Sequence, residues 1–174
     1  LSDYKVGIYS FAALFFEGLY QIPSLIRTNT NPVLVLLIKK YKKVKFDKFI
    51  YNVTTTSFLI TAFGCILLCL LYPLFQPIFP DNIIDKSHLI LIILCTGLLV
   101  YSFFIPIDFI FIQAGMPGTQ SLFMTINIVL NIILNLIFIP NFGLNGAAMA
   151  TAISLVISGL NLILIMNIKG LFSR

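Results

Sequence analysis

Five long apolar stretches constrain this chain more than any other feature of its sequence. They cover residues 4–28, 49–75, 89–112, 120–139 and 146–166, and a helix of about 20 residues is long enough to cross the hydrocarbon core of a bilayer. Backbone N–H and C=O groups find no water in lipid, so such stretches must satisfy their hydrogen bonds internally, as helices do. The pattern predicts an all-α, polytopic transmembrane helix bundle.

Composition supports a membrane protein. The chain is 59% hydrophobic and only 10% charged, with a mean hydropathy of +1.04, whereas soluble domains average about 25% charged residues. The lipid bilayer is therefore the expected surrounding. The chain begins at Leu1, directly before an apolar stretch, and we expect residues 1–174 to be a fragment of a longer protein. All three cysteines lie inside apolar runs, where thiols usually act as small hydrophobes, so no metal site is predicted.

Basic residues gather on one predicted side of the membrane. Six lysines lie within residues 39–48, between the first two apolar stretches, and the positive-inside rule makes this basic loop cytoplasmic. Threading the chain alternately from there brings Arg27, Lys169 and Arg174 to the same side, together with the C-terminus. The net charge of +5 then reflects topology, and no nucleic-acid partner is needed to explain it.

The first apolar stretch carries polar residues along one helical face. Spacings of seven, four, three and four residues separate Ser10, Glu17, Gln21, Ser24 and Thr28. Glu17 lies near the middle of the stretch, where an ionisable group is costly, so we expect it to face a water-filled cavity, a partner or a bound ion. It either takes part in coupling to an ion, proton or sodium, or holds helices together as a protonated or hydrogen-bonded residue.

Two further charged residues lie near the predicted cytoplasmic ends of their stretches. Arg27 either extends to the lipid headgroups or contacts a phosphate group of a substrate through its guanidinium fork. Asp108 lies about one turn before the end of the third stretch and shares a face with Tyr101, and Pro106 should distort the helix between them. Asp108 is a second candidate for a functional carboxylate, the alternative being a cap-like residue that faces water.

The last two stretches carry residues repeated every fourth position. In the first of them the repeated residues are amides, which form a line along one helical face: Asn127, Asn131 and Asn135. In the second they are small, and leave a groove that another helix backbone can approach closely: Gly146, Ala150, Ser154 and Ser158. We interpret the groove as a packing surface. The amide line fits helix packing and substrate binding about equally.

No constellation of catalytic residues is recognisable in the sequence. It contains no metal-ligand spacing, no Gly-rich phosphate loop and no Ser/His/Asp set that could converge. We therefore expect a protein that is not an enzyme and that needs no cofactor.

The segment IVLNIILNLIFIPNFGLNGAAMATAIS resembles the penultimate hairpin of the polysaccharide flippases, the O-antigen and capsule-repeat exporters of the multidrug/oligosaccharidyl-lipid/polysaccharide exporter superfamily. The positions that carry the resemblance are Asn131, Asn135, Ile139, Pro140, Phe142, Gly143, Gly146, Ala147, Ala148, Ala150 and Thr151. The stretch VGIYSFAALFFE is similar to the eighth helix of that family, and QAGMPGTQ to the loop before its eleventh.

This resemblance implies that the chain is the last five of about twelve helices, the C-terminal lobe of a two-lobed transporter that works by alternating access. The implied location is the bacterial cytoplasmic (inner) membrane. The implied cargo is an undecaprenyl-diphosphate-linked oligosaccharide, which such proteins carry to the outer leaflet for surface polysaccharide biosynthesis. This half offers only Arg27 to the diphosphate, so the other half would have to supply further basic residues.

Two other functions compete with the flippase interpretation. A cation-coupled multidrug exporter of the same superfamily would explain a buried Glu17 more naturally. A non-transporting membrane scaffold subunit would use the polar stripes only to join helices.

Overall fold

A computed structural model describes residues 3–39, 43–79 and 82–170, and within these ranges every regular element is helical. The helices are α1 (Asp3–Lys39), α2 (Lys43–Leu71), α3 (Ile83–Tyr101), α4 (Ile110–Gln113) and α5 (Pro117–Ile168). Two short 3₁₀ helices, η1 (Tyr72–Phe75) and η2 (Ile105–Ile107), follow α2 and α3. The all-α prediction is confirmed.

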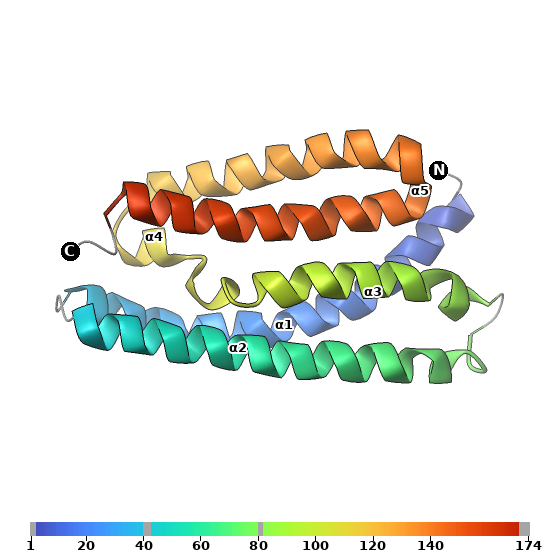
Figure 1. Cartoon of the computed structure of the whole chain (residues 1–174), viewed down its shortest axis with the longest axis horizontal. Coiled ribbons are helices and arrows are strands. Elements are labelled where there is room, and N and C mark those ends of the chain that lie inside the picture. The colour runs from blue at the N-terminus through green and yellow to red at the C-terminus, as the bar shows by residue number, and fades with distance from the viewer. Residues whose placement is uncertain (1–2, 40–42, 80–81, 171–174) are drawn as a thin grey trace.

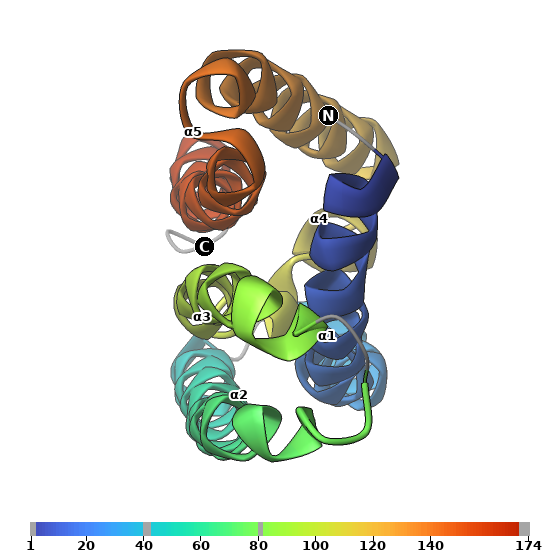
Figure 2. The same ribbon diagram turned by 90° about the vertical axis from the view of Figure 1, so that its right-hand side faces the viewer.

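The long helices lie side by side along one axis, and α5 folds back on itself to form two arms (Figure 1). Viewed from the end, α3 lies between the second arm of α5 and the pair α1 and α2 (Figure 2). Within the most apolar part of each helix, 44% of the residues are buried in α3, 17% in α2 and 6% in α5. Helix α3 is therefore the centre around which the other helices pack.

Three helical segments of the described chain are long and apolar enough to cross a membrane, namely Lys45–Phe75, Ile83–Tyr101 and Pro117–Ile168. Helix α1 is not among them, and α5 is a hairpin whose two arms are counted together. The bundle also presents large apolar side chains outward, with Phe63 and Leu70 each 70% exposed and Leu136 71% exposed. A helical bundle with an apolar exterior indicates a membrane protein, while the five separate crossings remain a prediction.

The predicted basic loop at residues 39–48 is mostly helical, which corrects the sequence-based boundary. Helix α1 continues to Lys39 and α2 begins at Lys43, while residues 40–42 lie outside the described chain. Hydropathy shows where a helix leaves the hydrocarbon, and lysine, a good helix former, lets the helix continue into water. The end of α1, the start of α2 and the end of α5 lie at the same end of the bundle as α4 (Figure 1), which we call the basic end. Lys39, Lys45, Lys48 and Lys169 belong to these segments or directly follow them in sequence. The C-terminal residues 171–174 lie outside the described chain.

The third apolar stretch, predicted as one span over residues 89–112, is broken. Helix α3 ends at Tyr101 and is followed by turns, η2 and the single turn of α4. Pro106 lies within η2 and has no N–H to donate to the preceding turn. The distortion expected at Pro106 is thus a full interruption of the helix, which we call the break (residues 102–109).

The hairpin of α5 reverses at Gly143, whose φ of 60° and ψ of −129° suit glycine and few other residues. Just beyond the turn, a Cβ atom on Gly146 would collide with the backbone carbonyl of Phe138 in the first arm. Farther along, the Asn161 side chain donates to Asn127 Oδ1 at 3.3 Å. Small residues and one amide pair therefore hold the two arms together.

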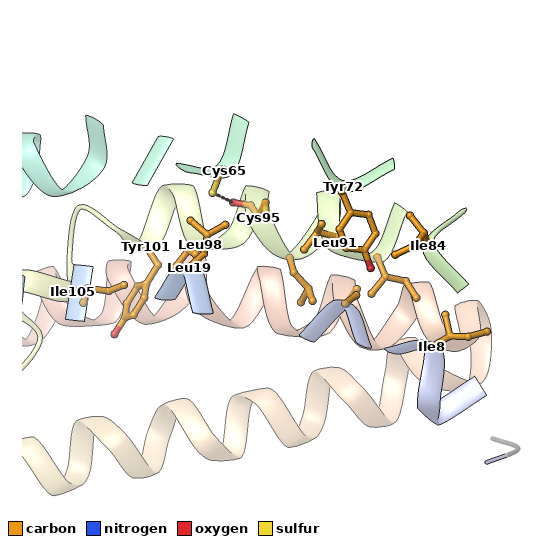
Figure 3. Packing of buried hydrophobic residues seen from close by; sticks show 14 residues of the cluster. Ile8, Leu19, Cys65, Tyr72, Ile84, Leu91, Cys95, Leu98, Tyr101 and Ile105 are labelled. Carbon is orange, nitrogen blue, oxygen red and sulfur yellow. Dashed lines mark hydrogen bonds between the residues drawn. The ribbon is translucent and has the colours of Figure 1, made fainter. Parts of the chain in front are cut away.

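The opposite side of the second arm packs closely on α3. A Cβ atom on Gly97 would lie 2.5 Å from the Cα of Ala152, and one on Gly159 would meet the ring of Phe104. The main apolar cluster continues from this seam into α1, α2 and η1, where Leu19, Cys65 and Tyr72 surround Leu91 and Leu98 of α3 (Figure 3). This cluster fixes α3 and thereby the position of the break that follows it.

Candidate functional site

The break meets α1 through an ion pair buried near the basic end. Arg27 Nη1 donates to the two carboxylate oxygens of Asp108, at 3.0 Å to Oδ2 and 3.3 Å to Oδ1. The side chains are only 17% and 9% exposed, respectively. Charges taken out of water are tolerated when they are paired and hydrogen-bonded. The two residues that the sequence singled out near the ends of separate stretches therefore form one structural unit.

Other side chains complete the surroundings of the guanidinium. Arg27 Nη2 donates to Ser24 Oγ at 2.8 Å, and the Arg27 Cζ lies 4.5 Å from the ring centroid of Phe109. A cation over an aromatic face is attracted by the negative potential of the ring. Tyr20 and Tyr101 flank the ion pair. Arg27 is thus directed into the bundle, and the structure does not leave it extended toward headgroups.

Carbonyl groups freed by the break accept hydrogen bonds from neighbouring helices. Ser57 of α2 donates to the carbonyl of Ser102 at 2.8 Å, and Gln120 Nε2 of α5 donates to the carbonyl of Asp108 at 2.9 Å. Both donors are buried. Because a broken helix in an apolar setting must find new partners for its backbone, these two side chains explain how the interruption is tolerated. Gln120 Oε1 is buried and has no hydrogen-bond partner among the described residues.

Four residues of the α1 stripe remain on the outside of the bundle. Ser10, Glu17, Gln21 and Thr28 are exposed, and only Ser24 is drawn into the ion-pair cluster. Glu17 and Asp108, the two candidate carboxylates, are therefore not brought together. The stripe adjoins the side of α1 that carries Arg27, since Ser24 belongs to both.

The amide line of α5 is half-buried along its length. Asn127 is bonded to Asn161 of the other arm, whereas Asn135 Nδ2 donates to the carbonyl and the side chain of Asn131, at 2.9 and 3.1 Å. Asn131 and Asn135 also line a shallow hollow of about 300 Å³ together with Ile132, Leu136, Ile139 and Pro140. In the amide line, Asn127 therefore joins the two arms of the hairpin, whereas Asn131 and Asn135 border the shallow hollow.

The small-residue groove lies inside the bundle. Ala150, Ser154 and Ser158 are 0%, 6% and 5% exposed, and Gly146 faces the first arm of the hairpin, as described above. The Ser158 hydroxyl donates to the carbonyl of Ser154 in its own helix at 2.8 Å. All four residues are available for packing, and none of them lines the hollow beside Asn131 and Asn135.

Metal-binding side chains do not gather in the described residues, where no group of three His, Cys, Asp or Glu could hold an ion. Cys65 and Cys95 are buried and Cys69 is half-buried, and the Cys65 thiol donates weakly to the carbonyl of Cys95 at 3.9 Å. These thiols join α2 to α3 as small packing residues (Figure 3).

Sequence reasoning did not single out three residues that the structure brings into these contacts: Gln120, Phe109 and Asn161. A signal was available for one of them, because Gln120 lies seven residues before Asn127 and continues the same helical face. The other contacts depend on how separate helices dock, which spacing along a single helix does not report.

The described chain is thus an all-helical bundle of the membrane type with an internal Arg–Asp pair at an interrupted helix. No protein-family model matches the sequence, and no curated protein is significantly similar to it.

Proposed function

We propose that this chain is part of a membrane transporter that moves an undecaprenyl-diphosphate-linked oligosaccharide across the cytoplasmic membrane by alternating access. The observation that carries the proposal is the exposed polar stripe of α1. Ser10, Glu17 and Gln21 lie on the outside of a bundle whose exterior is largely apolar, and polar groups inside a membrane are stable only against water, a partner or a bound ligand. A path for a polar cargo supplies such an environment.

The amide line of α5 adds a second set of groups that suit a sugar. Asn131 and Asn135 border the hollow next to Pro140, and amide side chains both donate to and accept from hydroxyl groups. Apolar side chains make up the rest of the hollow, as in many ligand sites, where a few polar groups orient a largely apolar surface. The hairpin resemblance described above supplies the class of cargo.

A cation-coupled exporter is the second candidate, and the exposed carboxylate of Glu17 favours it. In such a protein Glu17 would bind the coupling ion in one state and release it in another. Transport measured in Glu17→Gln separates the two roles, because unchanged activity with unchanged pH dependence would exclude coupling through this residue.

The direct test is restoration of polymer export in a strain that lacks its flippase, using the complete protein that contains this chain. We expect export to be restored by the parent protein and by Thr125→Leu, which replaces an exposed polar residue of α5 outside the amide line. Combined Asn131→Leu and Asn135→Leu should reduce export strongly at equal protein abundance. Drug efflux without export would establish the exporter instead, and neither activity would favour a scaffold.

A further inference from the structure

We propose that the Arg27–Asp108 ion pair is a two-state clasp. When closed, it holds the break against α1, and when open, it admits water between α1 and the break at the basic end. This inference rests on the proposed function in one respect, namely that a membrane carrier has to open to one side. The clasp itself is defined by the described residues, and it can be tested without any cargo.

The position of the pair between two apolar clusters is the first support. The larger cluster joins α1, α2 and α3 and includes Ile105 of η2. The smaller cluster lies toward the basic end and consists of Leu34, Phe46, Ile107, Ile110, Phe111, Phe123, Leu162 and Met166. Three of its members belong to η2 and α4, beyond the point where α3 stops. The break therefore contributes residues to both clusters, and Phe104 packs against each of them. An interrupted helix is a place where packed regions can hinge.

Polar side chains from three helices reach the break, which is the second support. Arg27 reaches it from α1, Ser57 from α2 and Gln120 from α5. Gln120 keeps a buried oxygen without a hydrogen-bond partner among the described residues, a cost that hydration would remove. The closed state therefore leaves one polar group at the break without the hydrogen bond that water would supply.

The energetics of a buried ion pair suit a clasp better than a permanent joint. In the closed state the charges attract each other in a medium of low dielectric, but both have lost their hydration. In the open state each regains water. The Coulomb attraction and the desolvation cost are large and opposite in sign, so the closed and open states differ little in free energy. Two apolar residues of similar size in place of the charges would favour the closed state.

Thiol labelling measures opening directly. The reporter is Thr30→Cys, in a background with Cys65→Ala, Cys69→Ala and Cys95→Ala. Thr30 is 5% exposed and lies one turn beyond Arg27 on α1. We expect Arg27→Gln, or Asp108→Asn if that variant is better folded, to raise the rate of labelling by N-ethylmaleimide in membranes at least about tenfold. The matched reporter is Ser154→Cys, which is 6% exposed in α5 and should stay slow.

A second variant distinguishes a clasp from a static joint. Arg27→Met combined with Asp108→Leu replaces both charges with apolar groups, and labelling of the Thr30→Cys reporter should fall below the rate of the parent. The proposal is overturned by an unchanged rate in both Arg27→Gln and Asp108→Asn, or by an equal rise at Ser154→Cys, which would mean general unfolding. It is also overturned if the Met/Leu variant labels as fast as the parent.

Discussion

At the scale of single residues, the break is stabilised by side chains that replace lost helical hydrogen bonds. Ser57 and Gln120 each donate to a carbonyl that the interrupted helix leaves open. Removing such a donor leaves a buried acceptor unpaired, and the cost is then the full desolvation of that acceptor. The contribution of these residues should exceed that of exposed hydroxyls that only bond within their own helix.

Ser57→Ala tests this difference. We expect it to lower the free energy of unfolding by about 1 to 3 kcal/mol, because the carbonyl of Ser102 loses its donor in a buried position. Ser121→Ala is the matched control on the exposed side of α5 and should change stability by less than about 0.5 kcal/mol. Circular dichroism during unfolding in detergent measures both, since the chain has no tryptophan. Equal effects in the two variants would contradict the role given to Ser57.

At the scale of elements, the seam between α3 and α5 depends on residues without bulk. Gly97 allows the backbone of Ala152 to approach, and Gly159 accommodates the ring of Phe104. The other side of the same arm packs against its own hairpin partner through Gly146. Helix α5 therefore uses small residues on two faces, and only one of the two was visible as a regular repeat in the sequence.

We expect Gly97→Ala to destabilise the contact between α3 and α5. Its new methyl group would lie 2.5 Å from the Cα of Ala152, and overpacking of this kind costs about 1 to 3 kcal/mol. Gly18→Ala is the control, because a Cβ there meets nothing within 4 Å. In a helix interior that substitution should stabilise by about 0.5 to 1 kcal/mol. Thermal unfolding followed by circular dichroism measures both variants. We expect Tm to fall in Gly97→Ala and to rise in Gly18→Ala.

The helices could be predicted from the sequence because apolar length and polar spacing are local properties. The interruption near Pro106 was foreseeable for the same reason, since a missing N–H acts within one turn. Pairing of Arg27 with Asp108 was not, because the two residues are 81 positions apart and each had a plausible role at a membrane surface. Helix ends were misjudged on both sides of the basic loop. Helix α1 continues past residue 28, through Pro32, to Lys39, and α2 begins at Lys43, before the apolar stretch starts at residue 49.

At the scale of the whole molecule, the polar and apolar exteriors divide the bundle into different surroundings. Helix α2 turns large apolar side chains outward along its length, whereas α1 exposes a polar stripe beside large apolar side chains such as Leu14 and Leu25. In a bilayer apolar surface suits lipid tails and a polar stripe does not. We therefore expect α2 to lie at the lipid boundary and the polar stripe of α1 to face water, cargo or another part of the protein.

Replacing lipid-facing residues of α2 by lysine tests this assignment. Phe63 and Tyr51 are both 70% exposed, but Phe63 lies near the middle of the apolar stretch 49–75 and Tyr51 near its start. We expect Phe63→Lys to impair membrane integration, since a lysine at the centre of a spanning helix costs about 2.5 to 3.5 kcal/mol. Tyr51→Lys should integrate almost normally because its ammonium group can reach the headgroups. The integrated fraction measures both, and equal tolerance would place this face of α2 outside the hydrocarbon.

The tight reversal at Gly143 has a consequence for the order of assembly. The two arms meet through Asn127 and Asn161, which are 34 residues apart, whereas Arg27 must find Asp108 across 81. Shorter separations close with a smaller loss of chain entropy, and contacts between near neighbours in sequence form faster. The hairpin should therefore form as an early unit and the ion pair as a late addition. The Arg27–Asp108 ion pair, as the last of these contacts to form, can then break while the α5 hairpin stays folded.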